Sequence, residues 1–181
     1  MTKFSRIAAT GIALASFAVA GQAQAATQAA ADVRAEVLSA LSVTVDPADN
    51  VLNFGTVADG GITAATDVII NADATRGNAC PATLICAGTP NTPTFTVAGL
   101  SGRTVQVSFQ NSTETLSHAA PPAGTDGTMT VKDFTTSLGA TNQLTLAATG
   151  NTFTVGGTLV VGPNQAEGVY AGTVTVNVAY N

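Results

Sequence analysis

The sequence predicts an all-β protein, built as an antiparallel β-sandwich of immunoglobulin-like architecture. From Leu41 onward, short segments rich in Thr, Val and Phe recur between clusters of Gly, Pro, Asn and Asp. No helical pattern of the kind that connects parallel strands lies between these segments. The last residues, GVYAGTVTVNVAYN, alternate with a period of two, which indicates a half-buried strand at the C-terminus.

Turn residues divide this pattern into ten expected strands. They are residues 41–45, 51–57, 67–71, 94–98, 104–110, 129–135, 143–147, 152–155, 158–161 and 169–180. Two long loops are expected, residues 72–93 and residues 111–128, and the second contains the chain's one histidine, His118. A lone histidine in a loop is usually solvated, so we expect His118 to bind no metal and to take no part in catalysis.

The N-terminus predicts export. Lys3 and Arg6 precede an apolar run from Ile7 to Ala20, and a small-x-small cleavage pattern ends at Ala25. This run is too short to cross a bilayer as a helix, so residues 1–25 are expected to be a cleaved signal peptide. The mature chain would begin at Ala26 and hold 156 of the 181 residues, enough for one domain with its own core.

Charge and motifs argue against nucleic-acid binding and catalysis. Four basic residues remain after residue 25 against eleven acids, a formal net charge of −7, and no basic stripe is present. The sequence has no Ser/His/Asp order with elbow glycines and no cluster of metal ligands. We therefore expect no enzyme activity, no catalytic residue, no metal and no cofactor.

Cys80 and Cys86 both lie in the predicted exported part, in the segment NACPATLICAG. A local disulfide is the favoured interpretation in an oxidising compartment, and such a short loop contributes about 2 kcal/mol. A redox pair is the alternative, although redox motifs use the tighter C-x-x-C spacing. A metal site would need two further ligands.

Residues 26–40 form a candidate N-terminal extension before the domain of residues 41–181. Charged residues fill the even positions from Asp32 to Glu36. The odd positions carry small apolar side chains: Ala29, Ala31, Val33, Ala35 and Val37. Period two indicates a strand that could insert into a groove on a neighbouring molecule. Val33, Val37 and Leu41 are also four apart, so a short amphipathic helix, or disorder in the isolated chain, remains open.

The C-terminal segment resembles the chaperone-recognition strand of pilins assembled by the chaperone-usher route. Those subunits carry a glycine fourteen positions from the end and an aromatic residue one position before the end, which correspond here to Gly168 and Tyr180. The alternation places one set of side chains on a single face: Tyr170, Gly172, Val174, Val176, Val178 and Tyr180. The resemblance implies that Gly168 and this face contact a chaperone and then a neighbouring subunit.

Three stretches together resemble the bacterial domain of unknown function 4402. They are LNFGTV at residues 52–57, TFTVAG at residues 94–99 and the closing block VGGTLVVGPNQAEGVYAGTVTVNVAYN from Val155. The family pattern has an early LxFG and a closing GGTLxV followed by GxYxGxxxVxVxY. The closing block is the specific part, and the cysteine loop lies outside the pattern.

Members of this family resemble fimbrial subunits, and the resemblance implies a sandwich that is completed by a donor strand from another subunit. The implied partners are a periplasmic chaperone, an outer-membrane usher and neighbouring copies. The implied localisation is the periplasm in transit and then the cell surface or the exterior. The alternative is a self-contained secreted binding module, such as an adhesin or matrix protein, whose sandwich is already complete.

Overall fold

The computed structural model describes residues 31–78 and 80–181, which contain strands and no helix. The chain divides into residues 1–36 and residues 37–181. In the first part, residues 31–36 are exposed and form no regular secondary structure. The predicted signal peptide and Ala29 of the predicted donor strand lie outside the described residues.

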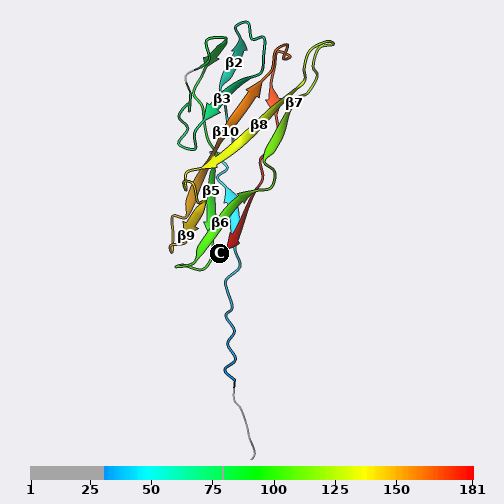
Figure 1. Ribbon diagram of the computed structural model, residues 1–181. Helices are drawn as coiled ribbons and strands as arrows, with labels where there is room; N and C mark the ends of the chain where they lie inside the picture. Colours follow the sequence, from blue (N-terminus) through cyan, green and yellow to red (C-terminus); the bar gives the residue numbers. More distant parts are fainter. Residues whose placement is uncertain (1–30, 79) are drawn as a thin grey trace, which may run out of the picture. The chain divides into compact units, whose positions relative to one another are not determined.

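The second part contains the strands, and Figure 1 shows their arrangement. Their bounds in chain order are β1 Ser42–Val45, β2 Thr56–Asp59, β3 Thr66–Ile70, β4 Leu84–Ala87, β5 Thr94–Ala98, β6 Thr104–Phe109, β7 Thr113–His118, β8 Thr128–Thr136, β9 Gln143–Thr145, β10 Thr152–Val161, β11 Tyr170–Ala171 and β12 Val176–Tyr180.

Every strand pair in the described residues is antiparallel. The largest sheet has the order β1-β5-β10-β8-β7-β11, with β3 also paired to β10. A second sheet has the order β12-β6-β9, and β2 pairs with β4 in a short arm. The prediction of an all-β antiparallel fold is confirmed, and the sheets are consistent with a β-sandwich. The immunoglobulin-like topology stays a prediction.

Strand β10 joins two hydrophobic cores, which lie at opposite ends of residues 37–181. The proximal core lies at the end near the C-terminus and is formed by Phe95, Val97, Val105, Val107, Leu146, Phe153, Val155 and Val176. The distal core lies at the other end and is formed by Phe54, Ile62, Val68, Ile70, Leu84, Val131, Leu159 and Val161. Phe134 packs against both cores, so the two ends form one continuous apolar interior.

Two glycines inside β10 explain why its sequence predicts two separate strands. Its first residues pair with β5, and Gly157–Val161 pair with β3 on the same edge, while β8 runs along the other edge. Gly156 and Gly157 interrupt the β-branched pattern, and the pairing with β8 shifts register there. A side chain at Gly156 would overlap the Ile70 carbonyl oxygen and lie 2.6 Å from the Ala72 nitrogen. The prediction of separate strands at 152–155 and 158–161 is therefore wrong. The glycines allow close approach without ending the strand.

Two strands occur inside predicted loops. β4 lies within the predicted loop 72–93, beside Pro81 and the cysteines, and is four residues long. β7 lies within the predicted loop 111–128 and alternates exposed with half-buried residues. Its inward positions are Glu114, Leu116 and His118. Because only one of these is an aliphatic residue, the alternation of β7 gives a weak hydrophobic signal.

Three further predictions are corrected. The strand expected at 51–57 begins only at Thr56, although Asn53 forms an isolated bridge with Asn91. The single strand expected at 169–180 is divided into β11 and β12, with residues 172–175 between them outside any strand. His118 is the last residue of β7 and is half-buried, so the expectation of a solvated loop histidine is also wrong.

We predict that Gly156→Ala destabilises the domain by at least about 1–3 kcal/mol, since a new methyl group must displace backbone atoms in a packed region. Chemical denaturation would measure the loss as a lower transition midpoint. Gly162→Ala is the matched control, because a methyl group there meets no atom within 4 Å. Equal midpoints for the two variants would show that β10 is not held as tightly at Gly156 as described.

Candidate functional site: an open cleft beside two unpaired strand edges

A cleft of about 300 Å³ opens between the segment that follows β1 and the segment that joins β11 to β12. One wall is formed by Val45 and residues 50–52, and the other by residues 172–174 with Glu114 and Leu116. The floor is apolar and consists of Phe54, Pro93, Phe95, Val131 and Phe134. Apolar side chains of the walls remain accessible, since Val45 is 41% exposed and Val51 is 55% exposed. The cleft therefore leads from the surface to side chains of both cores.

Local backbone geometry positions the first wall. The Asn53 side chain accepts a hydrogen bond of 2.8 Å from the Gly55 N–H, which makes a compact turn after Phe54. Gly55 has φ of +77°, a conformation that other residues rarely adopt. This turn keeps Phe54 buried while Leu52 lines the cleft. The LNFG stretch thus builds one side of the cleft.

The second wall exists because the C-terminal segment changes sheets. β11 pairs with β7 in the larger sheet, whereas β12 pairs with β6 in the three-stranded sheet. A side chain at Gly172 would lie 2.6 Å from Leu116 Cδ2 and 2.8 Å from the Thr115 carbonyl oxygen, so only glycine fits this approach. Residues 172–174 then cross between the sheets outside any ladder, and the Thr175 carbonyl accepts a 2.9 Å hydrogen bond from the Gln110 N–H directly after β6.

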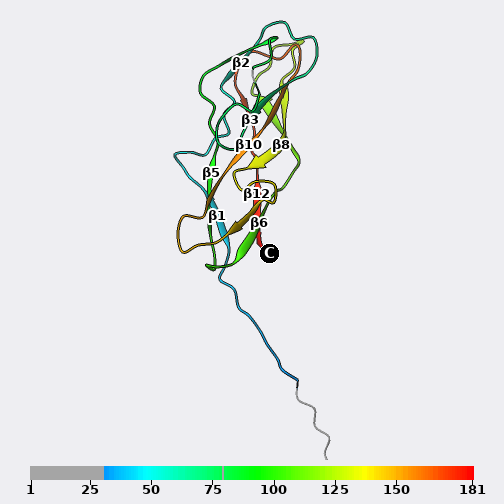
Figure 2. The ribbon, with the colours of Figure 1, turned by 60° about the vertical axis from the view of Figure 1, so that its left-hand side comes forward.

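Strand edges beside the cleft are also unpaired. Within the described residues β1 pairs with β5 alone and β12 with β6 alone, so each strand ends its sheet. β1 and β12 approach each other, and Figure 2 shows both near the C-terminus, but no ladder joins them. An unpaired edge next to exposed apolar side chains is a template for another strand.

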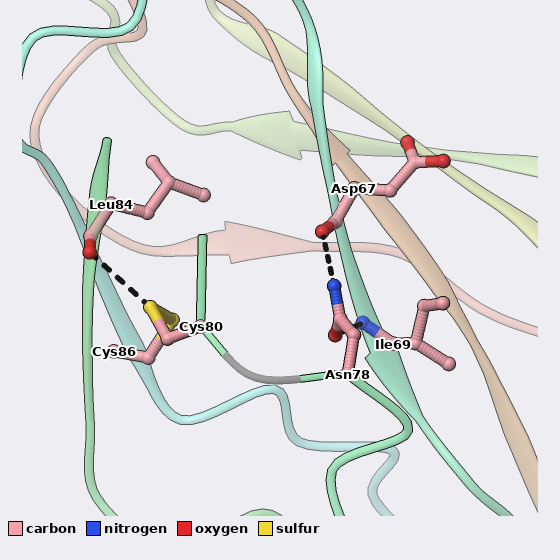
Figure 3. Close-up of a disulfide and its surroundings, with 6 residues drawn as sticks. All are labelled: Asp67, Ile69, Asn78, Cys80, Leu84 and Cys86. Carbon is pink, nitrogen blue, oxygen red and sulfur yellow. Dashed lines mark hydrogen bonds between the residues drawn. A yellow bond between two sulfur atoms is a disulfide. The ribbon is translucent and has the colours of Figure 1, made fainter. Parts of the chain in front are cut away.

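The outer edge of β3 is covered by hydrogen bonds from a neighbouring loop, as Figure 3 shows. The Asn78 amide donates a 3.0 Å hydrogen bond to the Asp67 carbonyl and accepts one of 3.0 Å from the Ile69 N–H. The Gly77 N–H also donates to the Ile69 carbonyl, at 2.9 Å. The chain's own residues therefore cover the outer edge of β3, whereas no strand of the described residues covers the outer edges of β1 and β12 beside the cleft.

The predicted disulfide between Cys80 and Cys86 is present. It links the segment just before β4 to β4 itself, and both cysteines pack against the distal core. The Cys80 sulfur lies 3.3 Å from the Leu84 carbonyl oxygen, a contact drawn in Figure 3. A disulfide sulfur carries no proton, so this contact is not a donated hydrogen bond. The disulfide lies away from the residues that line the cleft.

Gly168 and Tyr170 surround His118 at the end of β7. The rings of His118 and Tyr170 meet edge to face with centroids 5.4 Å apart, and His118 Nδ1 accepts a 3.1 Å hydrogen bond from the Ala120 N–H. A side chain at Gly168 would overlap the imidazole, and Gly168 has φ of +141°. Removal from solvent raises the pKa of Tyr170, and the negative charge of Asp126 acts in the same direction. The glycine of the predicted recognition strand is thus required by packing within the chain.

Tyr180, the aromatic residue of the predicted recognition strand, links the segment before β1 to the end of β12 by hydrogen bonds of its hydroxyl. Its hydroxyl accepts a 2.8 Å hydrogen bond from the Leu100 N–H and donates a 3.0 Å bond to the Ser39 carbonyl. A side chain at Gly99 would lie 2.7 Å from this hydroxyl, so the turn after β5 needs glycine to admit the tyrosine. Tyr180 therefore fixes Ser39 beside the C-terminal end of β12.

The predicted interaction face is distributed along the molecule rather than gathered in the cleft. Val174 and Gly172 line the cleft, whereas Val176, Val178 and Tyr180 belong to the proximal core or pack against it. The described residues of the predicted donor strand, Ala31, Val33, Ala35 and Val37, are exposed, with Val33 and Val37 each 92% exposed. Sequence reasoning did not identify Glu114 or the floor residues, because their convergence depends on pairing between distant strands.

Within the described ranges 31–78 and 80–181, no group of three or more His, Cys, Asp or Glu residues lies in a position to hold a metal ion. A search of the same residues for a helix capable of spanning a membrane finds none.

We predict that Tyr180→Phe lowers the free energy of unfolding by about 1 kcal/mol, because the ring remains packed while two hydrogen bonds are lost. Hydrogen exchange should show faster exchange at the Leu100 amide, with little change at the Val107 amide in the centre of β6. Thr115→Val, at an exposed position of β7, is the control. Unchanged protection of Leu100 in Tyr180→Phe would contradict the role of the hydroxyl.

Comparison with known proteins gives a family and no further relative. Searches among curated proteins and among solved structures found no match to the chain. The family model described as "Domain of unknown function (DUF4402)" matches residues 41–180. The match includes Leu52 and Phe54 on one side of the cleft and Gly172 and Val174 on the other. Since the model covers most of the sequence, the chain belongs to the DUF4402 family.

Proposed function

We propose that this protein is an exported structural subunit of a surface fibre, and that residues 29–37 of one copy insert as a strand at the cleft of the next. The observation that carries the proposal is the coincidence of an open apolar cleft with two unpaired strand edges in one domain. β-Strand addition needs both features, since the edge supplies backbone hydrogen bonds and the cleft receives alternate side chains.

The described part of the extension has the matching properties. Ala31, Val33, Ala35 and Val37 alternate with charged residues, and residues 31–37 are exposed and outside any helix or strand. Full burial of a valine side chain is worth about 1.5–3 kcal/mol, so two valines supply a modest hydrophobic contribution. Backbone hydrogen bonds along the strand edges would provide the rest of the binding energy and the alignment.

The open cleft and the neighbouring β1 and β12 strands suggest a route by which a donor strand would enter. The cleft is already open beside Val51 and Val174, whereas β1 and β12 approach each other. A donor of nine residues extends about 30 Å at 3.3 Å per residue, and we propose that it enters the cleft and parts these two strands. Insertion of one copy into the next is a head-to-tail contact that does not close on itself, and it therefore produces a fibre.

Export and assembly partners are part of the proposal. The signal-peptide pattern at residues 1–25 and the disulfide are compatible with an oxidising compartment outside the cytoplasm. An open subunit with exposed strand edges tends to aggregate, so we propose that a periplasmic chaperone covers the cleft until an outer-membrane usher directs assembly. The proposal gives the protein a structural role and no catalytic one.

The test separates donating from accepting. We predict that the double variant Val33→Asp/Val37→Asp folds normally, because both side chains are 92% exposed, but forms no fibres when expressed in place of the wild type. The introduced carboxylates would have to enter an apolar cleft, which is strongly unfavourable. Electron microscopy and gel electrophoresis of unboiled samples would measure fibres and ladders.

A matched control makes the same chemical change elsewhere. Val169→Asp alters a valine that is 81% exposed and lies outside the residues lining the cleft, so fibres should persist. The double variant should still bind a synthetic peptide of residues 29–40, because its own cleft is intact. Fibres formed by the double variant would overturn donation through this segment and would favour a self-contained binding module.

A further inference from the structure

One charged side chain lines the otherwise uncharged cleft. Glu114 lies on the inward face of β7 with Leu116 and His118, and it stands opposite Val131 of β8. Among the residues that line the cleft it is the one ionisable group, and the aromatic floor includes Phe54, Phe95 and Phe134. A half-buried carboxylate on the inward face of a sheet is unusual, because interior positions of a sandwich are normally apolar.

Within residues 31–78 and 80–181, Glu114 has a side-chain hydrogen bond from Asn111 and forms no ion pair. The Asn111 amide donates to its Oε1 at 3.0 Å. On β8 the charged neighbours are Lys132, which forms an ion pair of 3.0 Å with Asp67, and the exposed Asp133. Val131 is the residue opposite Glu114. Lys132 follows Val131 in the same strand, so its side chain lies on the other face of the sheet, away from Glu114.

Among the described residues that line the cleft, none supplies a counter-charge either. His118 lies on the same face of β7, four residues along, and is engaged by Tyr170 and the Ala120 N–H. Asp49 precedes the first wall, and its carboxylate accepts hydrogen bonds from Asn91 and Thr94. Residues 172–174 carry no ionisable side chain.

The donor would also leave this carboxylate without a cation. In the proposed register the inward residues are alanines and valines, while Arg34 is on the outward edge with Asp32 and Glu36. A donor strand that covers the cleft would remove water from Glu114 and replace it with methyl groups. Burial in an apolar environment favours the protonated form of a carboxylic acid.

We propose that Glu114 makes strand insertion dependent on pH, so that the donor binds more tightly when this carboxylate is protonated. This inference rests on the proposed function, because the ligand is the extension of a second copy. The sign follows from linkage: if the complex holds a proton at Glu114 more firmly than the open subunit does, binding strengthens as pH falls and weakens as pH rises.

The experiment measures peptide binding to an acceptor that cannot donate. The acceptor is the mature chain from Ala26 to Asn181 carrying Val33→Asp/Val37→Asp. The probe is a fluorescent, C-terminally amidated peptide of residues 29–40 with Asp32→Asn and Glu36→Gln, so that it has no carboxylate of its own. Fluorescence anisotropy at pH 5.0, 6.0 and 7.5 and constant ionic strength gives the dissociation constants.

We expect the acceptor to bind the peptide roughly threefold to tenfold more tightly at pH 5.0 than at pH 7.5. Glu114→Gln in the same acceptor should bind at every pH at least as tightly as the parent does at pH 5.0, with no pH dependence. Glu114→Asp keeps the ionisable group and should retain the dependence. Glu167→Gln changes an exposed acid outside the cleft and should behave as the parent.

The outcomes distinguish this inference from the function on which it rests. Peptide binding with the same pH dependence in Glu114→Gln and in the parent would overturn the role of Glu114 and leave strand insertion supported. Peptide binding that is independent of pH in the parent would also overturn the role of Glu114 while leaving strand insertion supported. Failure of every folded acceptor to bind the peptide at any pH would contradict the proposed function itself. Circular dichroism and thermal melts of each variant confirm that the acceptors are folded.

Discussion

The architecture depends on the passage of β10 through both cores. One strand supplies Phe153 and Val155 to the proximal core and Leu159 and Val161 to the distal core. Three other strands hold its two edges, and the backbone of residues 70–72 closes against Gly156. Because β10 is shared, the two ends cannot pack independently, and the strands at the outer positions must adapt to its course.

The C-terminal segment changes sheets along its length. It pairs with β7 near Tyr170 and with β6 from Val176 onward, so the intervening residues must cross between two sheets. Residues 172–174 belong to neither ladder, and the cleft opens beside them above the aromatic floor. The cleft is therefore a consequence of how the last strand serves two sheets, and it is bordered by the strand edges that remain unpaired.

Sequence patterns predicted the parts of this structure that depend on local chemistry. The alternation of Val174, Val176 and Val178 predicted a half-buried C-terminal segment, and the spacing of Cys80 and Cys86 predicted their disulfide, because each property involves neighbouring residues. β7 was missed, since its inward positions hold a glutamate and a histidine. The continuity of β10 was missed because Gly156 is explained only by the approach of residues 70–72. The cleft itself depends on residues more than a hundred positions apart, which a single sequence does not place together.

In the proposed fibre, the cleft of one copy and the extension of the next form a single contact. Hydrogen exchange of assembled protein and of the open subunit tests this most directly, because strand insertion protects backbone amides on both sides of the contact. We expect residues 31–37 and residues 172–175 to exchange rapidly in the open subunit and slowly in the assembled form, while the covered edge of β3 is unchanged. Rapid exchange of residues 31–37 in assembled protein would show that the extension is not inserted.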